Sequence, residues 1–199
     1  MPTFVSRAGS KLDHALNEFS LDVSGLICAD LGCNAGGFTD CLLQRGAAKI
    51  YAVDTGYGAL DWKLRNDPRV VTMERTNAMH VTLPEPVQLV VIDVAWTRQR
   101  HILPNAMKLL APNGKIVTLV KPHYEANKNE LQRGVLKDEA WDAVLARVLA
   151  DIESVGLELK AQTPSPIRGQ QGNAELLALL ETKQVMPSTE LSVDQSPTV

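Results

Sequence analysis

The sequence predicts an α/β fold in which a mostly parallel β-sheet is covered by helices on both faces. Short apolar runs alternate with amphipathic stretches along most of the chain, as strands alternate with helices in such folds. The run at 87–92 is almost continuously apolar, which is typical of a strand buried on both faces. A glycine-rich turn at 30–40 follows another such run, at the place where α/β proteins bind nucleotide cofactors.

The expected elements follow in chain order. Residues 8–19 form a first helix, because apolar side chains recur there at helical spacing, and Ser6 is its expected N-cap. We expect strands at 26–31, 49–53, 70–73, 87–92, 115–120 and 157–161. The helices expected between them cover residues 38–45, 60–65, 101–110 and 138–154.

Three segments need separate interpretation. Residues 122–137 are predicted to form a long polar loop, and loops of this length are often functional. Residues 174–181 have helical propensity throughout, and Asn173 is a suitable cap, so local residues alone predict a helix there. Residues 186–199 are rich in Ser, Thr and Pro and are expected to be a disordered tail. This leaves residues 1–185 as one domain.

Composition limits the function classes. The 199 residues are 45% hydrophobic, enough for one well-packed domain. The net charge is −3, whereas dedicated nucleic-acid modules are usually basic, so any nucleic-acid site has to be a local patch. The candidate patches are Arg7 with Lys11, then Arg65, Arg69 and Arg75, then Arg98, Arg100 and His101, and a solvated surface is the alternative.

Neither a membrane segment nor a metal site is expected. No apolar run approaches the ~20 residues that span a bilayer, and the N-terminus lacks the apolar core of a signal peptide. Cys28, Cys33 and Cys41 have no metal-ligand spacing and are interpreted as reduced thiols. We therefore expect a cytoplasmic protein without a bound metal.

The glycine-rich turn predicts a cofactor site. Glycines at 32, 36 and 37 allow close approach of a ligand, but their spacing differs from the GxGxxG of NAD proteins. Asp30 and Asp54 stand at the ends of successive strands, where negative charge disfavours a pyrophosphate. A cationic, zwitterionic ligand such as S-adenosylmethionine is favoured, and an NAD oxidoreductase is the weaker alternative.

Six ordered motifs between residues 5 and 182 resemble the TlyA (hemolysin A) family, a branch of the FtsJ-like RNA 2'-O-methyltransferases. They are Val5–Leu12, Gly36–Asp40, Glu74–Asn77, Asp93–Val94, Leu119–Pro122 and Ser165–Glu175. The resemblance implies a Rossmann-like class I methyltransferase fold with a seven-stranded sheet. It also implies S-adenosylmethionine as cofactor and ribosomal RNA as partner, methylated on a ribose 2'-hydroxyl. It further implies a last strand at 174–181, against the local helical propensity.

The resemblance also assigns site residues. The family's Lys-Asp-Lys-Glu catalytic tetrad corresponds to Lys11, Asp93, Lys121 and Glu175. Its cofactor-binding positions correspond to Asp30, Gly32, Cys33, Asn34, Gly36, Gly37, Phe38, Asp54, Asn77 and Asp93.

The chain departs from the family pattern in several places. Family members usually carry an N-terminal S4-type RNA-binding domain, whereas this sequence starts almost directly at the first motif. Ala95-Trp96 stands where a Ser-Phe pair is common, His123-Tyr124 replaces Gln-Phe, and the turn carries Cys33, Asn34 and Ala35 where Ser or Thr is usual. These departures concern RNA selection more than the chemistry.

The tetrad suggests a mechanism. A ribose hydroxyl is a poor nucleophile until its proton leaves, so the enzyme has to align the reactants and manage that proton. Lys121 is expected to act on the hydroxyl, either as a neutral base or as an ammonium that stabilises the oxyanion. Asp93 and Glu175 are expected to orient it, and Lys11 to tune the local field.

Other hypotheses remain open at this stage. Trp96 and Tyr124 are candidates for stacking on a flipped or single-stranded base, with ordinary packing as the alternative for Trp96. A catalytically degenerate module that binds RNA or cofactor without turnover is the second functional hypothesis. A membrane-active lysin is the third, and no amphipathic or spanning segment favours it.

Overall fold

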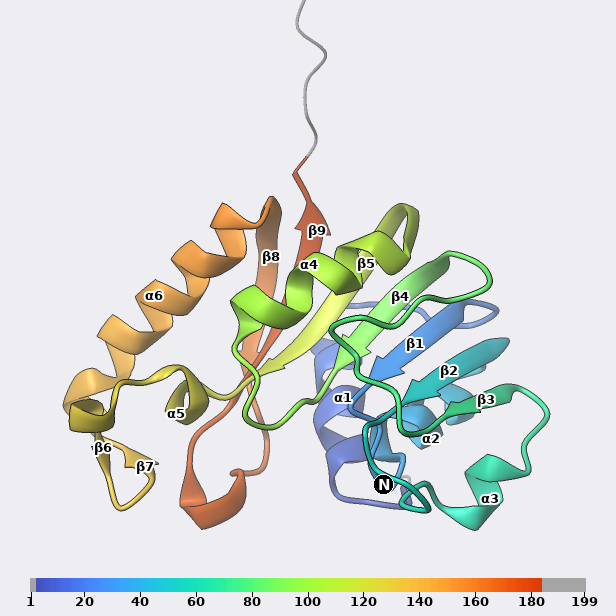
Figure 1. Cartoon of the computed structure of the whole chain (residues 1–199), viewed down its shortest axis with the longest axis horizontal. Coiled ribbons are helices and arrows are strands. Elements are labelled where there is room, and N and C mark those ends of the chain that lie inside the picture. The colour runs from blue at the N-terminus through green and yellow to red at the C-terminus, as the bar shows by residue number, and fades with distance from the viewer. Residues whose placement is uncertain (1–2, 184–199) are drawn as a thin grey trace, which may run out of the picture.

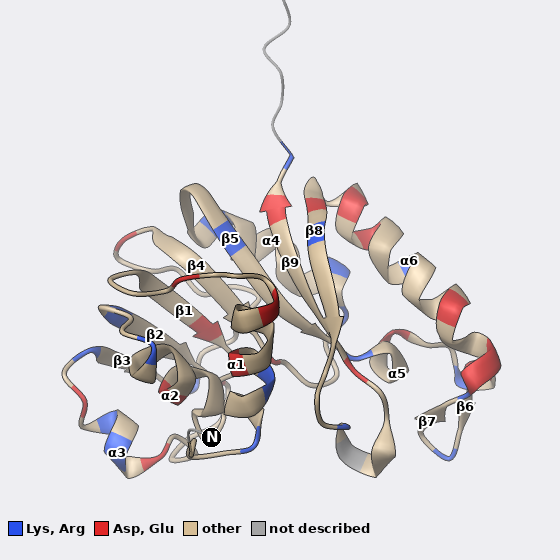
Figure 2. Cartoon of the chain, turned by 180° about the vertical axis from the view of Figure 1, so that it is seen from behind, with Lys and Arg blue, Asp and Glu red and all other residues tan. Residues whose placement is uncertain are grey.

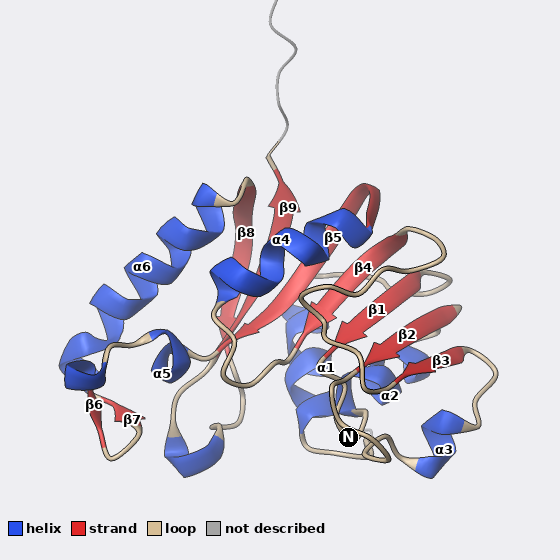
Figure 3. Ribbon diagram, viewed as in Figure 1, coloured by secondary structure: helices blue, strands red, loops and turns tan. Residues whose placement is uncertain are grey.

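A seven-stranded sheet crosses the middle of the molecule in the order β3-β2-β1-β4-β5-β9-β8 (Figures 1 and 3). The structure is a computed structural model that describes residues 3–183. The strands are β1 Ile27–Leu31, β2 Lys49–Val53, β3 Val70–Met73, β4 Val87–Ile92, β5 Leu110–Val120, β8 Leu157–Pro164 and β9 Leu176–Thr182. β9 runs antiparallel to both of its neighbours, and the strands from β3 to β5 pair in parallel.

Helices cover both faces of this sheet, as the sequence predicts. They are α1 Ala8–Glu18, α2 Gly37–Gln44, α3 Trp62–Arg65, α4 Gln99–Leu109, α5 Pro122–Glu125 and α6 Trp141–Ser154. In Figure 1, α4 and α6 lie in front of the sheet and α1 and α2 lie behind it. The expected bounds differ from the observed ones by a few residues at most helix ends, where bounds are least determined by sequence.

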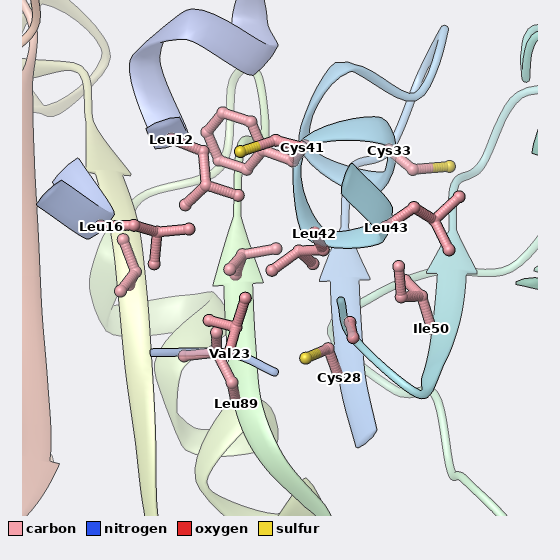
Figure 4. Packing of buried hydrophobic residues seen from close by; sticks show 14 of the residues in the cluster. Leu12, Leu16, Val23, Cys28, Cys33, Cys41, Leu42, Leu43, Ile50 and Leu89 are labelled. Carbon is pink, nitrogen blue, oxygen red and sulfur yellow. The ribbon is translucent and has the colours of Figure 1, made fainter. Parts of the chain in front are cut away.

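Two buried apolar clusters hold the layers together. Figure 4 shows one of them, in which Leu12 and Leu16 of α1 and Leu42 of α2 pack onto the sheet near Leu89. The other cluster joins α4 and α6 to the opposite face, through side chains such as Ile102. Each fully buried Leu or Ile contributes roughly 1.5–3 kcal/mol relative to exposure, so these clusters dominate the stability of the fold.

The local helical prediction for residues 174–181 is wrong, and the strand implied by the family resemblance is confirmed. β9 inserts between β5 and β8, and its first five residues are all buried. Leucine and alanine favour a helix in isolation, but a position between two other strands, under helices on both sides of the sheet, buries both faces of the segment. The hydrogen bonds of β9 to β5 and to β8, together with apolar packing on both of its faces, outweigh a helix-propensity advantage of a few tenths of a kcal/mol per residue.

Smaller corrections concern caps and bounds. The N-cap of α1 is Arg7 rather than Ser6, and it makes no side-chain capping hydrogen bond. β5 begins five residues earlier than expected, because Leu110 pairs with Val87 ahead of a register shift. The polar loop 122–137 contains α5, a 3-10 turn at Lys128–Glu130 and a two-stranded hairpin, β6 Leu131–Gln132 and β7 Val135–Leu136.

β8 forms an edge of the sheet, and charged side chains protect it. Lys160 pairs with Glu158 of the same strand at 2.9 Å and approaches Glu181 of β9 at 3.9 Å. Figure 2 shows these alternating charges on β5, β9 and β8. Charged residues on an edge strand disfavour pairing with another chain.

Two further expectations concern the C-terminal tail and a membrane-spanning segment. The tail predicted at 186–199 lies outside the described residues. Across residues 3–183, none of the helices combines the length and the apolar character that crossing a membrane requires.

Candidate active site

A cavity of about 650 Å³ opens where the strand order reverses, between β1 and β4. Ligands of open α/β sheets bind at such a reversal, beyond the carboxyl ends of the strands. Most of the predicted site residues line this cavity. They are Lys11, Gly32, Cys33, Asn34, Phe38, Asp54, Asn77, Asp93, Lys121 and Glu175.

Lys11 and Glu175 form an ion pair at one side of the cavity. Lys11 comes from α1, and Glu175 stands just before β9, so 164 positions of sequence separate the two residues. Each is 5% exposed. Charges buried this deeply are tolerated when they are paired, and removing one partner leaves the other at a high energetic cost.

Lys121 and Asp93 form a second ion pair, at the ends of β5 and β4. The Nζ of Lys121 lies 2.6 Å from the Oδ1 of Asp93 and donates a hydrogen bond to the carbonyl of Val94 at 3.1 Å. An amino nitrogen has three positions beyond its carbon, for protons or a lone pair. Two of these are directed at protein acceptors, which leaves one for a group inside the cavity.

This pairing differs in one respect from the sequence expectation. Asp93 pairs with Lys121, but the ion-pair partner of Glu175 is Lys11 and not Lys121. The four charged side chains therefore form two ion pairs around one cavity, with no net charge. Asp93 is also not the cap of the following helix, because α4 begins after Arg98.

The glycines of the predicted cofactor turn serve the protein's own packing. A Cβ on Gly32, whose φ is +88°, would lie 2.6 Å from the carbonyl oxygen of Asp93. A Cβ on Gly37 would lie 2.2 Å from the Oγ of Ser6 and 2.8 Å from the amide nitrogen of Gly9. Glycine is thus required where β1 meets β4 and where α2 meets the start of α1. Gly37 and its neighbour Gly36 are outside the cavity lining.

Asp30 also lies behind the cavity wall. Its side chain is completely buried, and its Oδ2 accepts a hydrogen bond from the hydroxyl of Thr39 at 2.7 Å. Its Oδ1 has no hydrogen-bond partner among the described residues. Burial raises the pKa of this carboxyl to about 7, and the nearby charges of Asp93 and Asp54 add to the effect.

Asp54 is positioned by the loop that follows β2. Its Oδ2 accepts the N–H of Asn34 at 2.9 Å, and its Oδ1 accepts the N–H of Gly56 at 2.7 Å. The carboxylate thereby ties the β1 turn to the end of β2. Asn77 lies beside it, and its Oδ1 accepts the N–H of Met79 at 2.9 Å.

An aromatic group forms the outer wall of the cavity. The ring of Trp96 lies 4.7 Å from that of Tyr124, and Trp96 is 83% exposed. The ring of His123 lies 4.1 Å from Tyr124. Burial lowers the pKa of His123 to about 4, with a smaller effect from Lys121, so the imidazole is neutral at pH 7. Because Trp96 is largely exposed, it is available to a ligand, and this argues against a packing role for it.

The basic patches suggested by the sequence differ in the partners that their arginines have in the structure. Arg65 pairs with Glu74, and Arg69 pairs with Asp67 at 2.7 Å, so the second patch is largely neutralised. Arg75 lies over the ring of Tyr57 at 4.3 Å. Arg7 lines the cavity beside Lys11.

Sequence reasoning missed several lining residues. They are Ser6, Ala8, Thr55, Thr76, Ala78, Met79, Val94, Ala95, Thr97, Ile102 and Gly169. Most of them are adjacent in sequence to a predicted residue. Ser6, Ala8, Thr76, Val94 and Gly169 lie inside the six motifs, and Thr55, Ala78, Met79, Ala95 and Thr97 lie within two positions of a predicted residue. Ile102 comes from α4 and had no such signal.

Comparison with known proteins identifies relatives over nearly the whole chain. The profile of the FtsJ-like methyltransferase family matches residues 4–182. The Bacillus subtilis protein YqxC, which has a provisional rRNA-methyltransferase name, is 43% identical over 87% of this chain and 64% of its own length. TlyA of Mycobacterium tuberculosis, named a 16S/23S rRNA (cytidine-2'-O)-methyltransferase, is 42% identical over 90% of this chain and 69% of its own.

Solved structures agree with these relatives. A Streptococcus thermophilus protein assigned by name to the hemolysins superimposes with a TM-score of 0.89 at 39% identity, covering 92% of this chain and 69% of that one. The N-methyltransferase NodS of Bradyrhizobium japonicum shares the fold alone, with a TM-score of 0.60 at 18% identity over 90% of this chain and 99% of that one. This chain spans 64% of the length of the Bacillus subtilis relative. The sheet order, the position of the cavity and a profile match over residues 4–182 together establish that the chain belongs to the FtsJ-like methyltransferase family.

Proposed function

We propose that the chain transfers a methyl group from S-adenosylmethionine to a ribose 2'-hydroxyl of ribosomal RNA. The observation that carries the proposal is Lys121, which lines a cavity at the strand-order reversal and whose amino group has two protein acceptors, so that one position remains for a substrate group. Two relatives named cytidine-2'-O-methyltransferases support the RNA hydroxyl as the acceptor.

The cavity wall fits a cationic cofactor. Asp54 and Asp93 line it as carboxylates, and Asn34 and Asn77 add polar groups on the same side. These residues would hold S-adenosylmethionine, which supplies an electrophilic methyl group on a sulfonium. These side chains follow the ends of four neighbouring strands, β1, β2, β3 and β4, so the sheet positions them.

Lys121 would act on the substrate hydroxyl. A neutral amine would direct its two N–H bonds to Asp93 and Val94, and its lone pair would accept the hydroxyl proton. An ammonium in the same place would direct its third N–H at the developing oxyanion. In either form Asp93 fixes the rotamer of Lys121. The Lys11–Glu175 pair adds a fixed dipole to one wall without adding net charge.

Trp96 and Tyr124 would receive the base of the target nucleotide. Stacking of a base on an exposed aromatic ring is worth about 1–3 kcal/mol and requires that the base leave its helix or lie in a single strand. The two rings stand on the same cavity as Lys121, so a stacked base would bring its own ribose toward the amine. A protein acting on ribosomal RNA works in the cytoplasm, which is the location we propose.

The test is methyl transfer from labelled S-adenosylmethionine to ribosomal subunits and to naked ribosomal RNA. Nuclease digestion and mass spectrometry of the product identify the methylated atom. The proposal predicts 2'-O-methylated nucleosides with wild-type protein and none above background with Lys121→Ala.

The matched control is Lys108→Ala, which removes an exposed lysine of α4 outside the cavity and leaves the activity unchanged. Wild-type protein that binds the cofactor tightly but labels no RNA would favour a degenerate binding module instead. A methyl group on a base or on protein would contradict the ribose assignment.

A further inference from the structure

Trp96 stands in a backbone conformation that bulky residues rarely adopt. Its φ is +62°, in the left-handed region, where the Cβ of a side chain crowds the backbone. Such a residue persists only when its surroundings fix it. The ring is 83% exposed, so its own burial does not hold the loop in place.

The first half of the loop at 93–98 is held by the catalytic region. The N–H of Asp93 donates to the carbonyl of Leu31 at 3.0 Å. The carbonyl of Val94 accepts the hydrogen bond from Lys121. The start of the loop is thus fixed to the ends of β1 and β5.

The second half is held by a carboxylate from another element. α4 begins at Gln99, and Arg98 before it has an extended conformation and provides no side-chain cap. The Oε1 of Glu125 instead accepts the N–H of Gln99 at 2.8 Å, across 26 positions of sequence. An acceptor at this position satisfies an N–H that has no partner within the helix, and its charge is favoured there.

This contact is part of a buried polar chain. Glu125 is 7% exposed and Gln99 is 2% exposed. The hydroxyl of Thr118 in β5 donates to the side-chain oxygen of Gln99 at 2.8 Å. Burial raises the pKa of Glu125, and the hydrogen bond from Gln99 opposes that effect. Three elements therefore meet at the start of α4.

Glu125 directly follows Tyr124 in α5, and α5 begins right after Lys121. We propose that Glu125 is a positioning residue, which caps α4 from α5 and so holds the Trp96 loop against Tyr124 and Lys121. Glu125 does not line the cavity, so it acts through these residues and touches no reacting group. The predicted effect of Glu125 on RNA affinity rests on the proposed function, whereas its effect on the loop does not.

The expected size of the effect of removing the Glu125 carboxylate follows from the loss of a helix N-cap. Removing a helix N-cap changes the local equilibrium by a factor of about five. The apparent affinity for RNA falls with the fraction of molecules whose loop is correctly placed, and so by at most about fivefold. Cofactor affinity and kcat change little, because Asp54, Asn77 and Lys121 keep their own contacts.

The experiment compares Glu125→Ala and Glu125→Gln with Glu130→Ala. Glu130 is the matched control, because its carboxylate also accepts a backbone N–H of the same segment, that of Asn127 at 2.7 Å, away from the cavity. Hydrogen exchange measured by mass spectrometry on the full chain follows the peptide covering 94–103. Glu125→Ala should speed exchange there about fivefold, whereas Glu125→Gln, which keeps an acceptor oxygen, and Glu130→Ala should change it less than twofold.

Steady-state methylation supplies the second measurement. Glu125→Ala should raise KM for RNA, by at most about fivefold, at nearly unchanged kcat, and Glu125→Gln should restore it. Unchanged exchange at 94–103 would overturn the proposal, as would an equal loss of kcat and cofactor affinity, which marks a general structural role. Wild-type protein that methylates no RNA would contradict the proposed function, and the exchange comparison would still decide whether Glu125 holds the loop.

Discussion

Loss of Glu175 should destabilise the protein severely, because Lys11 would remain as an unpaired charge in the interior. The side chains of the pair are 6% and 3% exposed. Glu175→Gln keeps nearly the same volume but removes the negative charge. Breaking a buried pair in this way costs about 3–5 kcal/mol, whereas replacing both partners with apolar residues is often nearly neutral.

The double-mutant cycle makes this quantitative. We expect about 4 kcal/mol of destabilisation for Glu175→Gln and a similar loss for each of the single variants Glu175→Leu and Lys11→Met, which complete the cycle. Lys11→Met combined with Glu175→Leu should recover most of the loss, giving a coupling energy of several kcal/mol. With a urea m-value of about 2 kcal/mol/M, each single variant would lower the unfolding midpoint by about 2 M.

Urea unfolding followed by circular dichroism measures these midpoints. The control is Lys115–Glu181, an ion pair between β5 and β9 with side chains 37% and 32% exposed, whose loss should cost at most about 1 kcal/mol. The double variant should fold but fail to methylate RNA, which separates stability from catalysis. Single variants that unfold within 1 kcal/mol of wild type would refute the buried-pair reasoning.

Three further predictions follow from the site. Gly37→Ala places a Cβ 2.2 Å from the Oγ of Ser6 and 2.8 Å from the nitrogen of Gly9, so it should cost about 1–3 kcal/mol in urea unfolding; wild-type stability would contradict this contact. For Asp30, whose pKa is raised by burial to about 7, the folded state keeps a proton that the unfolded state releases near pH 4. The stability of wild type relative to Asp30→Asn should therefore fall by up to about 4 kcal/mol as pH rises from 4 to 7, and a constant difference across this window would argue against it. Trp96→Ala should raise KM for RNA about tenfold without changing stability by more than about 0.5 kcal/mol, because the ring is 83% exposed; unchanged KM would exclude stacking.

Most of the strands were predictable because a buried strand requires a continuous run of apolar residues, which is visible in the sequence. β2, β3 and β4 have the predicted bounds, since an apolar run and its flanking polar residues coincide with the edges of the sheet. β9 is the opposite case. Its residues favour a helix locally, and only its place between β5 and β8 makes it a strand, which no local pattern contains.

Most of the residues that the sequence assigned to the site line one cavity, but the ion pairs among them were not predictable. Asp93 and Lys121, which the family resemblance assigned to one tetrad, follow the neighbouring parallel strands β4 and β5 and form an ion pair. Which carboxylate pairs with which lysine depends on how α1 packs against the segment before β9, and periodicity carries no information about that. Asp30 is buried behind the cavity wall beside Thr39 of α2, and periodicity does not predict that contact either.

The central claim is that Lys121 acts on the substrate hydroxyl, and single-turnover methyl transfer at saturating cofactor tests it most directly. Rates are compared for wild type, Lys121→Met and Lys121→Arg, with cofactor affinity measured in parallel by calorimetry. We predict a loss of about 10²–10⁴ in rate for Lys121→Met at a cofactor affinity within about twofold of wild type. A rate within a few fold of wild type, or a rate loss explained by weaker cofactor binding, would contradict the account.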